Sequence, residues 1–419
     1  MRILQVIHDF IDTTLAGSEL YTYYLCKELM KRHEVAVFYY KYKKSLDGHP
    51  ILEQRSYEGT KTFTVSMPTP ALYHWSIVHY QDKQVDKLFR DVLISFKPEI
   101  VHFQHLLFSS MGFPNITKIL AIPTVHTLHD FWLMCPRIRL INHKLKRCDE
   151  INRLKCFICC LRPYSRKNLL KRLVMESPYC AQSLYHLFYK REKAVRRVFK
   201  NIDLFISPSK FLRSKFIAYG LLQEKIIYCD NGMNYNVLKN YHNRKRPTNH
   251  MIFAYIGSHQ VEKGVPLLIE AFNGISDTQL RIYGSGGEKQ YQGLIKNPNI
   301  HLMGRVEDDQ KAEAFSEIDV LIVPSLWFEN SPLTIHEAFM FGVPVITSNI
   351  GGMAELVEDG RTGLHFEVGN AEDLRRKIQF CIDSPAEVER MAQNIPKVKS
   401  IQENVQELEE IYSNLISGY

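Results

Sequence analysis

Residues 318–337 read IDVLIVPSLWFENSPLTIHE, and this stretch is the clearest guide to the fold. Ile318 to Pro324 is an apolar run as long as one buried strand, and a polar loop follows it. Ser331 is a favourable N-cap and Pro332 suits the first position of a helix, so we expect a helix to begin there. A buried strand that leads directly into a helix is the unit of a parallel sheet covered by helices.

The same alternation runs through both halves of the chain. In the second half it predicts strands at 251–256, 278–283, 299–303, 319–323 and 343–347, with helices at 264–274, 310–317 and 332–341. In the first half it predicts strands at 2–7, 34–40, 62–66, 99–103, 122–128, 202–206 and 225–228, with helices at 19–31 and 108–120 and a helix begun by Ser209. A polar stretch at 231–250 is typical of a linker between the halves.

We therefore predict an α/β protein with two doubly wound, Rossmann-like domains that face a central cleft. The first domain covers residues 1–240 and carries a Cys-rich and basic insertion at about 135–200. The second covers 250–395, and 396–419 contains an amphipathic helix at 401–416.

The composition is that of a folded protein rather than a disordered or fibrous one. Of the 419 residues, 45% are apolar and 23% are charged. No apolar run approaches the roughly 20 residues that span a bilayer, and the first residues lack the pattern of a secretory signal. We expect a cytoplasmic protein whose nine cysteines are reduced.

Two acids bracket the helix predicted at 332–341. Glu329 lies just before it and Glu337 lies within it. The free N–H groups and positive end of such a helix suit a diphosphate, while the carboxylates suit sugar and ribose hydroxyls. The structural alternative is an acid that stabilises the helix dipole and a second, solvated acid.

Two further turns follow strands and open helices, as phosphate-binding turns do. Residues 257–264 read GSHQVEKG, in which Lys263 supplies positive charge, and residues 16–19 read AGSE. A Lys-Gly pair on its own more often marks an ordinary turn.

Taken together, the order of these motifs resembles one family. Gly-Ser-Glu at 17–19, His-Asp-Phe-Trp at 129–132, Gly-x5-Lys-Gly at 257–264, Glu-x7-Glu at 329–337 and GGMAELVEDGRTG at 351–363 are similar to the family 4 retaining glycosyltransferases (glycosyl transferases group 1) of the GT-B fold. The resemblance covers most of the chain and is strongest from Phe253 to Val368.

The resemblance implies a set of donor contacts. It places Glu329 on the sugar, Glu337 on the ribose and Lys263 on the phosphates. In the segment after Glu329, the residues implied to contact the sugar and the diphosphate are Asn330, Ser331, Pro332 and Leu333. Gly17 and Ser18 approach from the other domain, and Ser258 stands where many members have an arginine. The C-terminal helix is implied to cross back onto the first domain.

Two histidines follow the strand predicted at 122–128. Either His126 or His129 can be a structural histidine, but the resemblance places His129 beside the transferred sugar as a catalytic residue together with Glu329. It also implies transfer on the face that the diphosphate leaves, with the diphosphate taking the acceptor proton. The sequence contains no Asp-x-Asp, so we expect transfer to need no metal ion or other cofactor.

Five cysteines fall between residues 135 and 160. Cys135, Cys148, Cys156 and Cys159 have a spacing that can close a structural zinc site. An iron–sulfur cluster and unliganded thiols are the alternatives. From Arg137 to Lys200 there are 18 Lys/Arg against 4 Asp/Glu, a balance of 18 − 4 = +14. This block indicates either an anionic partner, best an anionic membrane surface, or a solvated helical face.

These observations predict a hexosyl- or other glycosyltransferase that takes its sugar from a UDP- or GDP-linked donor. The expected acceptor is a glycan linked to a lipid such as a polyprenyl diphosphate, in the biosynthesis of a cell-surface polysaccharide or lipopolysaccharide. The expected location is the inner face of the cell membrane, with peripheral attachment. We expect no nucleic-acid partner, because no recognised binding module is present. The alternatives are a nucleotide-sugar epimerase of the same fold and an inactive relative that only binds the donor.

Overall fold

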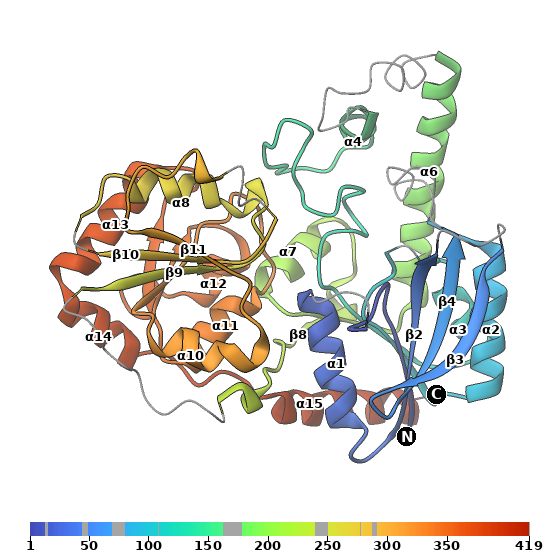
Figure 1. Ribbon diagram of the computed structural model, residues 1–419. Helices are drawn as coiled ribbons and strands as arrows, with labels where there is room; N and C mark the ends of the chain where they lie inside the picture. Colours follow the sequence, from blue (N-terminus) through green and yellow to red (C-terminus); the bar gives the residue numbers. More distant parts are fainter. Residues whose placement is uncertain are drawn as a thin grey trace. The chain divides into compact units, whose positions relative to one another are not determined.

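A computed structural model describes residues 1–12, 16–43, 49–68, 80–107, 109–161, 178–238, 250–276, 278–286 and 291–418. The chain forms two compact units (Figure 1). Unit 1 consists of Met1–Gly232 with Ile401–Tyr419, and unit 2 consists of Met233–Ser400. Residues 162–177 of the predicted basic insertion and 239–249 of the predicted linker lie outside the described residues.

Unit 1 is built on an eight-stranded sheet in the order β3-β4-β2-β1-β5-β6-β7-β8. The strands are β1 (Arg2–Val6), β2 (Glu34–Lys43), β3 (Ile51–Tyr57), β4 (Thr60–Pro68), β5 (Ile100–Phe103), β6 (Thr124–Thr127), β7 (Leu204–Ser207) and β8 (Ile226–Tyr228). All neighbours are parallel except β3, which pairs antiparallel with β4. The sequence pattern did not predict β3, whose mostly polar residues line the sheet edge.

Helices cover both faces of this sheet. They are α1 (Gly17–Leu29), α2 (Lys83–Phe96), α3 (Phe113–Ile119), α6 (Pro178–Asn201), α7 (Lys210–Ala218) and α15 (Ile401–Ser417), while α4 (Arg153–Leu161) lies in the insertion and packs on α6. The side chains of β2 show which helices cover which face of the sheet. Val37 and Tyr39 join the core with α1 and α15, whereas Phe38 contacts Phe89 of α2 and Phe113 of α3. Successive side chains of a strand point to opposite faces, so one strand serves both cores.

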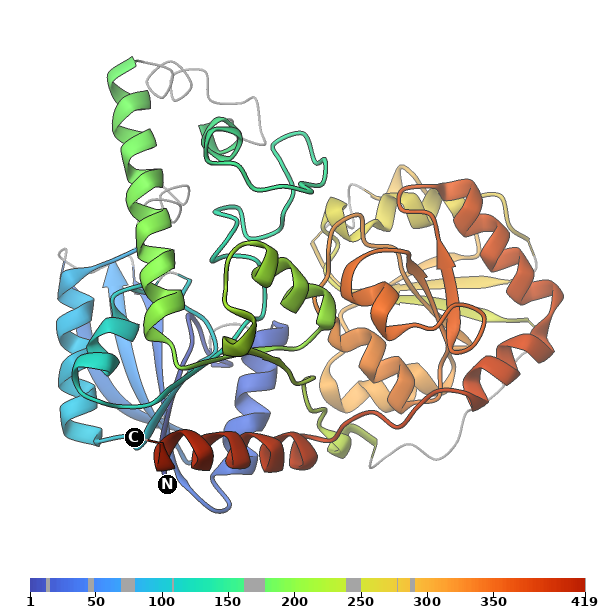
Figure 2. The same ribbon diagram turned by 180° about the vertical axis from the view of Figure 1, so that it is seen from behind.

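The C-terminal helix α15 packs on unit 1, beside α1 (Figure 2). Val405, Leu408 and Tyr412 are fully or almost fully buried in the core that they share with β1 and α1. Three polar contacts add to this apolar burial. The Tyr21 hydroxyl donates to Asn404 Oδ1 at 2.8 Å, Tyr412 Oη lies 2.6 Å from His102 Nδ1, and Glu409 lies 2.6 Å from His33 Nε2.

Unit 2 has a six-stranded, all-parallel sheet in the order β11-β10-β9-β12-β13-β14. The strands are β9 (Ile252–Ile256), β10 (Gln279–Tyr283), β11 (Ile300–Gly304), β12 (Val320–Val323), β13 (Val345–Ser348) and β14 (Gly363–Phe366). Numbered within the unit, this is the order 3-2-1-4-5-6 of the Rossmann fold. Five of these strands were predicted and β14 was not.

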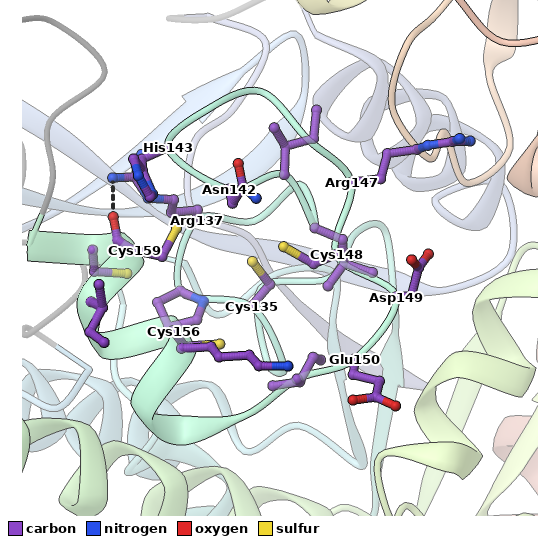
Figure 3. A pocket seen from close by; sticks show the side chains of 17 residues that line it. Cys135, Arg137, Asn142, His143, Arg147, Cys148, Asp149, Glu150, Cys156 and Cys159 are labelled. Carbon is purple, nitrogen blue, oxygen red and sulfur yellow. Dashed lines mark hydrogen bonds between the residues drawn. The ribbon is translucent and has the colours of Figure 1, made fainter.

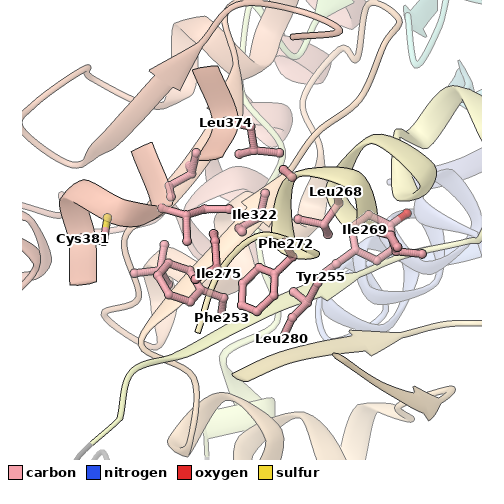
Figure 4. Close-up of a cluster of buried hydrophobic side chains, with 14 of the residues drawn as sticks. Phe253, Tyr255, Leu268, Ile269, Phe272, Ile275, Leu280, Ile322, Leu374 and Cys381 are labelled. Carbon is pink, nitrogen blue, oxygen red and sulfur yellow. The ribbon is translucent and has the colours of Figure 1, made fainter. Parts of the chain in front are cut away.

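The helices of unit 2 bury an apolar core on each side of its sheet. They are α8 (Val265–Phe272), α10 (Lys311–Ser316), α11 (Leu333–Met340), α12 (Gly351–Leu356), α13 (Ala371–Asp383) and α14 (Pro385–Gln393). Phe253, Leu268 and Leu374 belong to the core beneath α8 and α13 (Figure 4). Ala254, Ile335 and Phe315 belong to the core beneath α10 and α11.

Between β6 and β7 the chain departs from the alternating rhythm, as predicted for the insertion. A loop with a bridge between Ile141 and Arg147 leads into α4 and then into α6. Part of its basic character serves internal packing. Arg191 is buried with its guanidinium 5.3 Å from the centroid of the Trp132 ring, and Arg153 pairs with Glu192 at 2.7 Å. Within the described ranges, no helix is both long and apolar enough to cross a bilayer.

Candidate functional site

The sheet order of unit 2 fixes where a ligand can bind. From β9 the chain continues to β10 on one side, whereas from β12 it continues to β13 on the other, although β9 and β12 are neighbours. In such sheets the loops that follow these two strands separate and leave a crevice at their carboxyl ends. The loop after β9 contains Lys263, and the loop after β12 contains Glu329. The two residues singled out from separate motifs therefore meet at the switch point.

Lys263 and Glu329 form an ion pair. The Lys263 ammonium donates to Glu329 Oε1 at 2.7 Å, and the same oxygen accepts from Ser325 Oγ at 2.8 Å and Trp327 Nε1 at 2.6 Å. Burial works to raise the pKa of Glu329, but the ammonium of Lys263 and the two other donors hold it below its usual range. The carboxylate is therefore charged and held in one orientation.

Two glycines allow these loops to approach one another. Gly264 has φ +80, and a Cβ there would lie 1.9 Å from the carbonyl oxygen of Pro324. A Cβ on Gly352 would lie 1.4 Å from the carbonyl oxygen of Asn330, and the Gly352 N–H donates to the carbonyl of Glu329 at 3.0 Å. The GGMAEL segment thus does more than shape a turn, because it supports the backbone of residues 329–330.

The start of α11 differs from the prediction. The helix begins at Leu333, with Pro332 in the N-cap position at φ −67 and ψ 118 and with no side-chain cap. The prediction that Ser331 caps the helix and Pro332 begins it was wrong. Ser331 Oγ instead lies 2.7 Å from His336 Nε2, so its hydroxyl orients that ring. Asn330, Ser331, Pro332 and Leu333 are all partly exposed at this helix start.

Glu337 lies on α11 and is buried, with 6% of its surface exposed. Its Oε1 accepts from Lys311 Nζ at 2.6 Å, and Asp308 holds the same ammonium at 2.6 Å. Burial raises the pKa of Glu337, although Lys311 opposes the shift. Lys311 and Asp308 were not predicted, because they lie 26 or more residues before Glu337 and only the fold joins them.

Ser258 is exposed in the loop after β9. Its carbonyl accepts from the Tyr255 hydroxyl at 2.7 Å. The loop is held a second time by the Tyr291 hydroxyl, which donates to the carbonyl of His259 at 2.7 Å. The backbone of this phosphate-compatible turn is therefore positioned by two buried tyrosines.

Unit 1 has its own switch point, between β1 and β5. Gly17 and Ser18 begin α1 in the loop after β1, where Ser18 Oγ donates to Glu19 Oε2 at 2.9 Å. Glu19 is 1% exposed and its other oxygen lies 3.1 Å from His8 Nε2. Burial raises the pKa of Glu19 and lowers that of His8.

His129 lies with Asp130 just after β6, at the same edge. His129 Nε2 lies 2.8 Å from Gln104 Oε1, and His105 Nε2 lies 2.9 Å from Asp130 Oδ2. Burial and the neighbouring His105 lower the pKa of His129 to about 3. The centroids of the His8 and His105 rings lie 4.6 Å apart, with the rings tilted by 58°, so the network joins the loops after three strands.

His126 has a structural position. It lies within β6, is 3% exposed, and donates from Nδ1 to the carbonyl of Phe103 at 2.8 Å. Burial lowers its pKa to about 4. The structure thus separates the two histidines that sequence alternation left open: His129 belongs to the polar network and His126 to the core.

The insertion contains a pocket of about 560 Å³ lined by five cysteines (Figure 3). Cys135, Cys148, Cys156 and Cys159 all contribute, together with Cys160. Burial and neighbouring thiols raise the pKa of Cys148 and of Cys156 to about 11. In the described part of the chain, no three His, Cys, Asp or Glu side chains are grouped as ligands of a metal ion.

Comparisons with known proteins agree with this architecture. The family model "Glycosyltransferase Family 4" matches residues 15–237, and "Glycosyl transferases group 1" matches residues 239–398. An uncharacterized glycosyltransferase of Methanocaldococcus jannaschii is 30% identical over 188 residues, which are 44% of this chain and 51% of that protein. The capsular polysaccharide biosynthesis glycosyltransferase CapM of Staphylococcus aureus is 26% identical over 257 residues, 55% of this chain and 66% of CapM. The matched region is thus about half of the first relative and just under two thirds of CapM.

The whole fold has solved counterparts. Anabaena HepE, crystallised in complex with UDP-glucose, superimposes with a TM-score of 0.66 at 17% identity, covering 99% of this chain and 100% of that one. The likeness establishes the GT-B architecture of two Rossmann-like sheets.

Proposed function

The chain belongs to glycosyltransferase family 4, and from that premise we propose that it moves a sugar from a UDP- or GDP-linked donor to a glycan acceptor with retention of configuration. The observation that carries the proposal is the Lys263–Glu329 pair at the switch point of the second sheet. This pair offers an ammonium for a diphosphate and an oriented carboxylate for sugar hydroxyls. The start of α11 adds backbone N–H groups beside them.

In this proposal unit 2 holds the donor. Lys263, the turn at Ser258 and the main chain at 330–333 contact the diphosphate, and Glu329 contacts the sugar. Glu337 contacts the ribose, kept in place by Lys311. HepE was crystallised with UDP-glucose, which supports a nucleotide sugar as the ligand of this fold.

In the proposed reaction, the new bond forms on the same face of the sugar as the bond that breaks. The acceptor hydroxyl oxygen bonds to the anomeric carbon on the face from which the diphosphate departs, the bond between that carbon and the diphosphate oxygen breaks, and the acceptor proton passes to the diphosphate. His129, neutral because its pKa is lowered to about 3, contacts the transferred sugar without adding charge. Gly17 and Ser18 lie in the same unit 1 half-site. Lys263 and the helix start offset the charge on the diphosphate, so no metal ion is required.

We further propose a lipid-linked acceptor at an anionic membrane surface. The insertion exposes Leu154 (56%) and Ile158 (41%) on α4 and Tyr185 (41%) and Tyr189 (36%) on α6. Exposed cations lie close to these side chains in the sequence: Lys155, Lys190 and Lys193. Apolar side chains among cations suit the interface of an anionic bilayer. The likeness to CapM supports a role in making a cell-surface polysaccharide.

The donor half-site is tested by Glu329→Ala. We expect turnover with the correct nucleotide sugar to fall at least about a hundredfold, because one oriented charge at the reacting sugar is lost. Glu317→Gln is the matched control: Glu317 also pairs with a cation, Arg281, but lies before β12 rather than after it. Near-normal turnover of a folded Glu329→Ala protein would contradict the assignment.

Three simple assays test the remaining parts of the proposal. Incubation with a nucleotide sugar and no acceptor yields a new nucleotide sugar only if the protein is an epimerase. Transfer measured with and without a chelator tests the expected independence from metal. Activity that disappears with the chelator and returns with magnesium or manganese would contradict it. Sedimentation with anionic vesicles, reduced in a Leu154→Ser/Ile158→Ser variant, tests the membrane surface.

A further inference from the structure

The four cysteines of the Cys-x12-Cys-x7-Cys-x2-Cys pattern come from two segments of the insertion and line one pocket. Cys135 and Cys148 lie at the two ends of a loop, while Cys156 and Cys159 lie one turn apart on α4. Figure 3 shows the Cys135 and Cys148 side chains pointing toward one another. Cysteines distant in the chain are thus brought together by the fold and not by local sequence alone.

The loop between Cys135 and Cys148 is tightly constrained. The Ile138 N–H donates to the carbonyl of Cys135 at 2.8 Å, and the Cys148 N–H donates to the carbonyl of Leu140 at 2.7 Å. Ile138 (φ 73), Leu140 (φ 50) and Leu145 (φ 58) adopt left-handed backbone conformations. A left-handed β-branched residue such as Ile138 is unfavourable and persists only where the surroundings impose it.

The loop is also tied to α4. Arg137 Nη2 donates to the carbonyl of Cys159 at 2.7 Å, which joins the first cysteine segment to the second. Apolar packing holds only part of the insertion: Leu140, Ile141 and Phe157 are buried, whereas Leu145 (48%), Leu154 (56%) and Ile158 (41%) are exposed. A small segment with exposed apolar side chains and clustered thiols is one that a metal typically stabilises.

We propose that Cys135, Cys148, Cys156 and Cys159 are the ligands of a structural metal centre bound by four thiolates, independent of the transfer reaction. On binding, each thiol loses its proton to solvent and its sulfur bonds to metal. Four thiolates leave no open position, so the centre fixes the insertion rather than reacting. The pocket also contains Arg137, Arg147 and Lys155, which outnumber Asp149 and Glu150 and suit the net negative charge of such a centre.

Two metal centres share this chemistry. A single Zn²⁺ holds four sulfurs at about 2.3 Å, so the thiols of the 560 Å³ pocket, which are not grouped as ligands, would have to draw together. An iron–sulfur cluster is larger and uses the same four cysteines.

The test uses the full chain, purified anaerobically without chelator. Elemental analysis should give about one zinc per chain, or iron and acid-labile sulfide in equal amounts with visible absorbance. Cys148→Ser and Cys156→Ser should each weaken metal retention at least about tenfold. Cys160→Ser, in the same pocket but outside the proposed set, should keep its metal.

A second measurement uses only the wild-type protein and therefore does not depend on whether the variants fold. Titration of the wild-type protein with a mercurial thiol reagent should release the metal in step with the modification of about four thiols. Less than about half an equivalent of any metal per wild-type chain would overturn the proposal. So would loss of metal in Cys160→Ser equal to that in Cys148→Ser.

Discussion

At the scale of single residues, the donor half-site depends on close backbone approach as much as on charge. Lys263 and Glu329 can meet because Gly264 lets its loop contact the Pro324 carbonyl, and Gly352 lets α12 contact the Asn330 carbonyl. At both positions a side chain would clash with the carbonyl oxygen that faces it, so glycine is required. The charged residues are visible in the sequence as a motif, but the reason for the glycines is not.

We predict that Gly352→Ala lowers kcat/KM by about a hundredfold, because displacing residues 329–330 by about 1 Å misplaces the reacting groups. The added Cβ would lie 1.4 Å from the Asn330 carbonyl oxygen, so the segment must move. Steady-state kinetics with the identified donor measures the effect. Gly293→Ala is the control, since nothing lies within 4 Å of its Cβ. Equal kinetics for the two variants would show that Gly352 does not support the site.

The buried histidines are expected to make the stability of unit 1 depend on pH. Burial lowers the pKa of His126 to about 4 and that of His129 to about 3. The unfolded chain takes up these protons near pH 6.5, whereas the folded chain does not. Stability is therefore expected to fall as the pH drops from about 6.5 to 4, by up to about 2 kcal/mol per buried histidine at pH 5.

Calorimetry between pH 7 and 5 tests this expectation. The unfolding midpoint of unit 1 should decrease over that range, and the decrease should be smaller in His126→Gln. A midpoint that stays constant from pH 7 to 5 would show that these imidazoles are not held neutral in the folded protein.

At the scale of elements, the strand-to-helix units bring each polar group to the same edge of its sheet. The loops after β1, β5 and β6 place His8, Gln104 and His129 together, and the loops after β9 and β12 place Lys263 and Glu329 together. The helix α15 has a different role. It completes the core of unit 1 and also closes a buried polar contact through Tyr412.

We predict that Tyr412→Phe lowers the free energy of unfolding of unit 1 by about 1–3 kcal/mol, because it removes the shorter of two contacts of a ring nitrogen of buried His102 and leaves only Gln104 Nε2, at 3.4 Å. Denaturant unfolding monitored on unit 1 measures the change. Tyr228→Phe is the matched control, since Tyr228 is 43% exposed. If both variants lose the same stability, the buried contact has no special weight.

At the scale of the whole molecule, the chain consists of two units that each have their own sheet and cores. Apart from Gly17 and Ser18, the residues expected to contact the nucleotide sugar through its nucleotide belong to unit 2. A ligand that binds only the folded form of one unit stabilises that unit by mass action.

We therefore predict that the nucleoside diphosphate of the donor raises the unfolding midpoint of unit 2 more than that of unit 1. At a concentration about 100 times its Kd, the expected gain is about 2.7 kcal/mol. Calorimetry with hydrogen exchange assigns each transition to its unit. Protection confined to unit 1 would contradict the assignment of the donor half-site.

The sequence by itself determined the fold class. Strands such as β9 and β12 are continuous apolar runs, which buried parallel strands require, and their spacing with helices leaves few other architectures. It also indicated Lys263 and Glu329, because each lies at a strand-to-helix turn, and Glu337, because it lies on the helix that follows Glu329. Ser209 was correctly predicted to begin α7, where it accepts the Leu212 N–H at 3.1 Å. The polar edge strand β3 lacks an apolar pattern and was not predicted.

Only the tertiary structure decided which groups are partners. Lys311 with Glu337, Glu19 with His8, and Asp130 with His105 are separated by 26, 11 and 25 residues. Asp130 and His105 meet because β5 and β6 are neighbouring strands, whereas Glu19 meets His8 because α1 turns back beside the end of β1. Local spacing carries no information about either arrangement. The same holds for α11, where the backbone at Pro332 and the contact of Ser331 with His336 moved the helix start to Leu333. The chain specifies its strands and helices locally, but the chemistry of its sites arises where distant loops meet at the edge of a sheet.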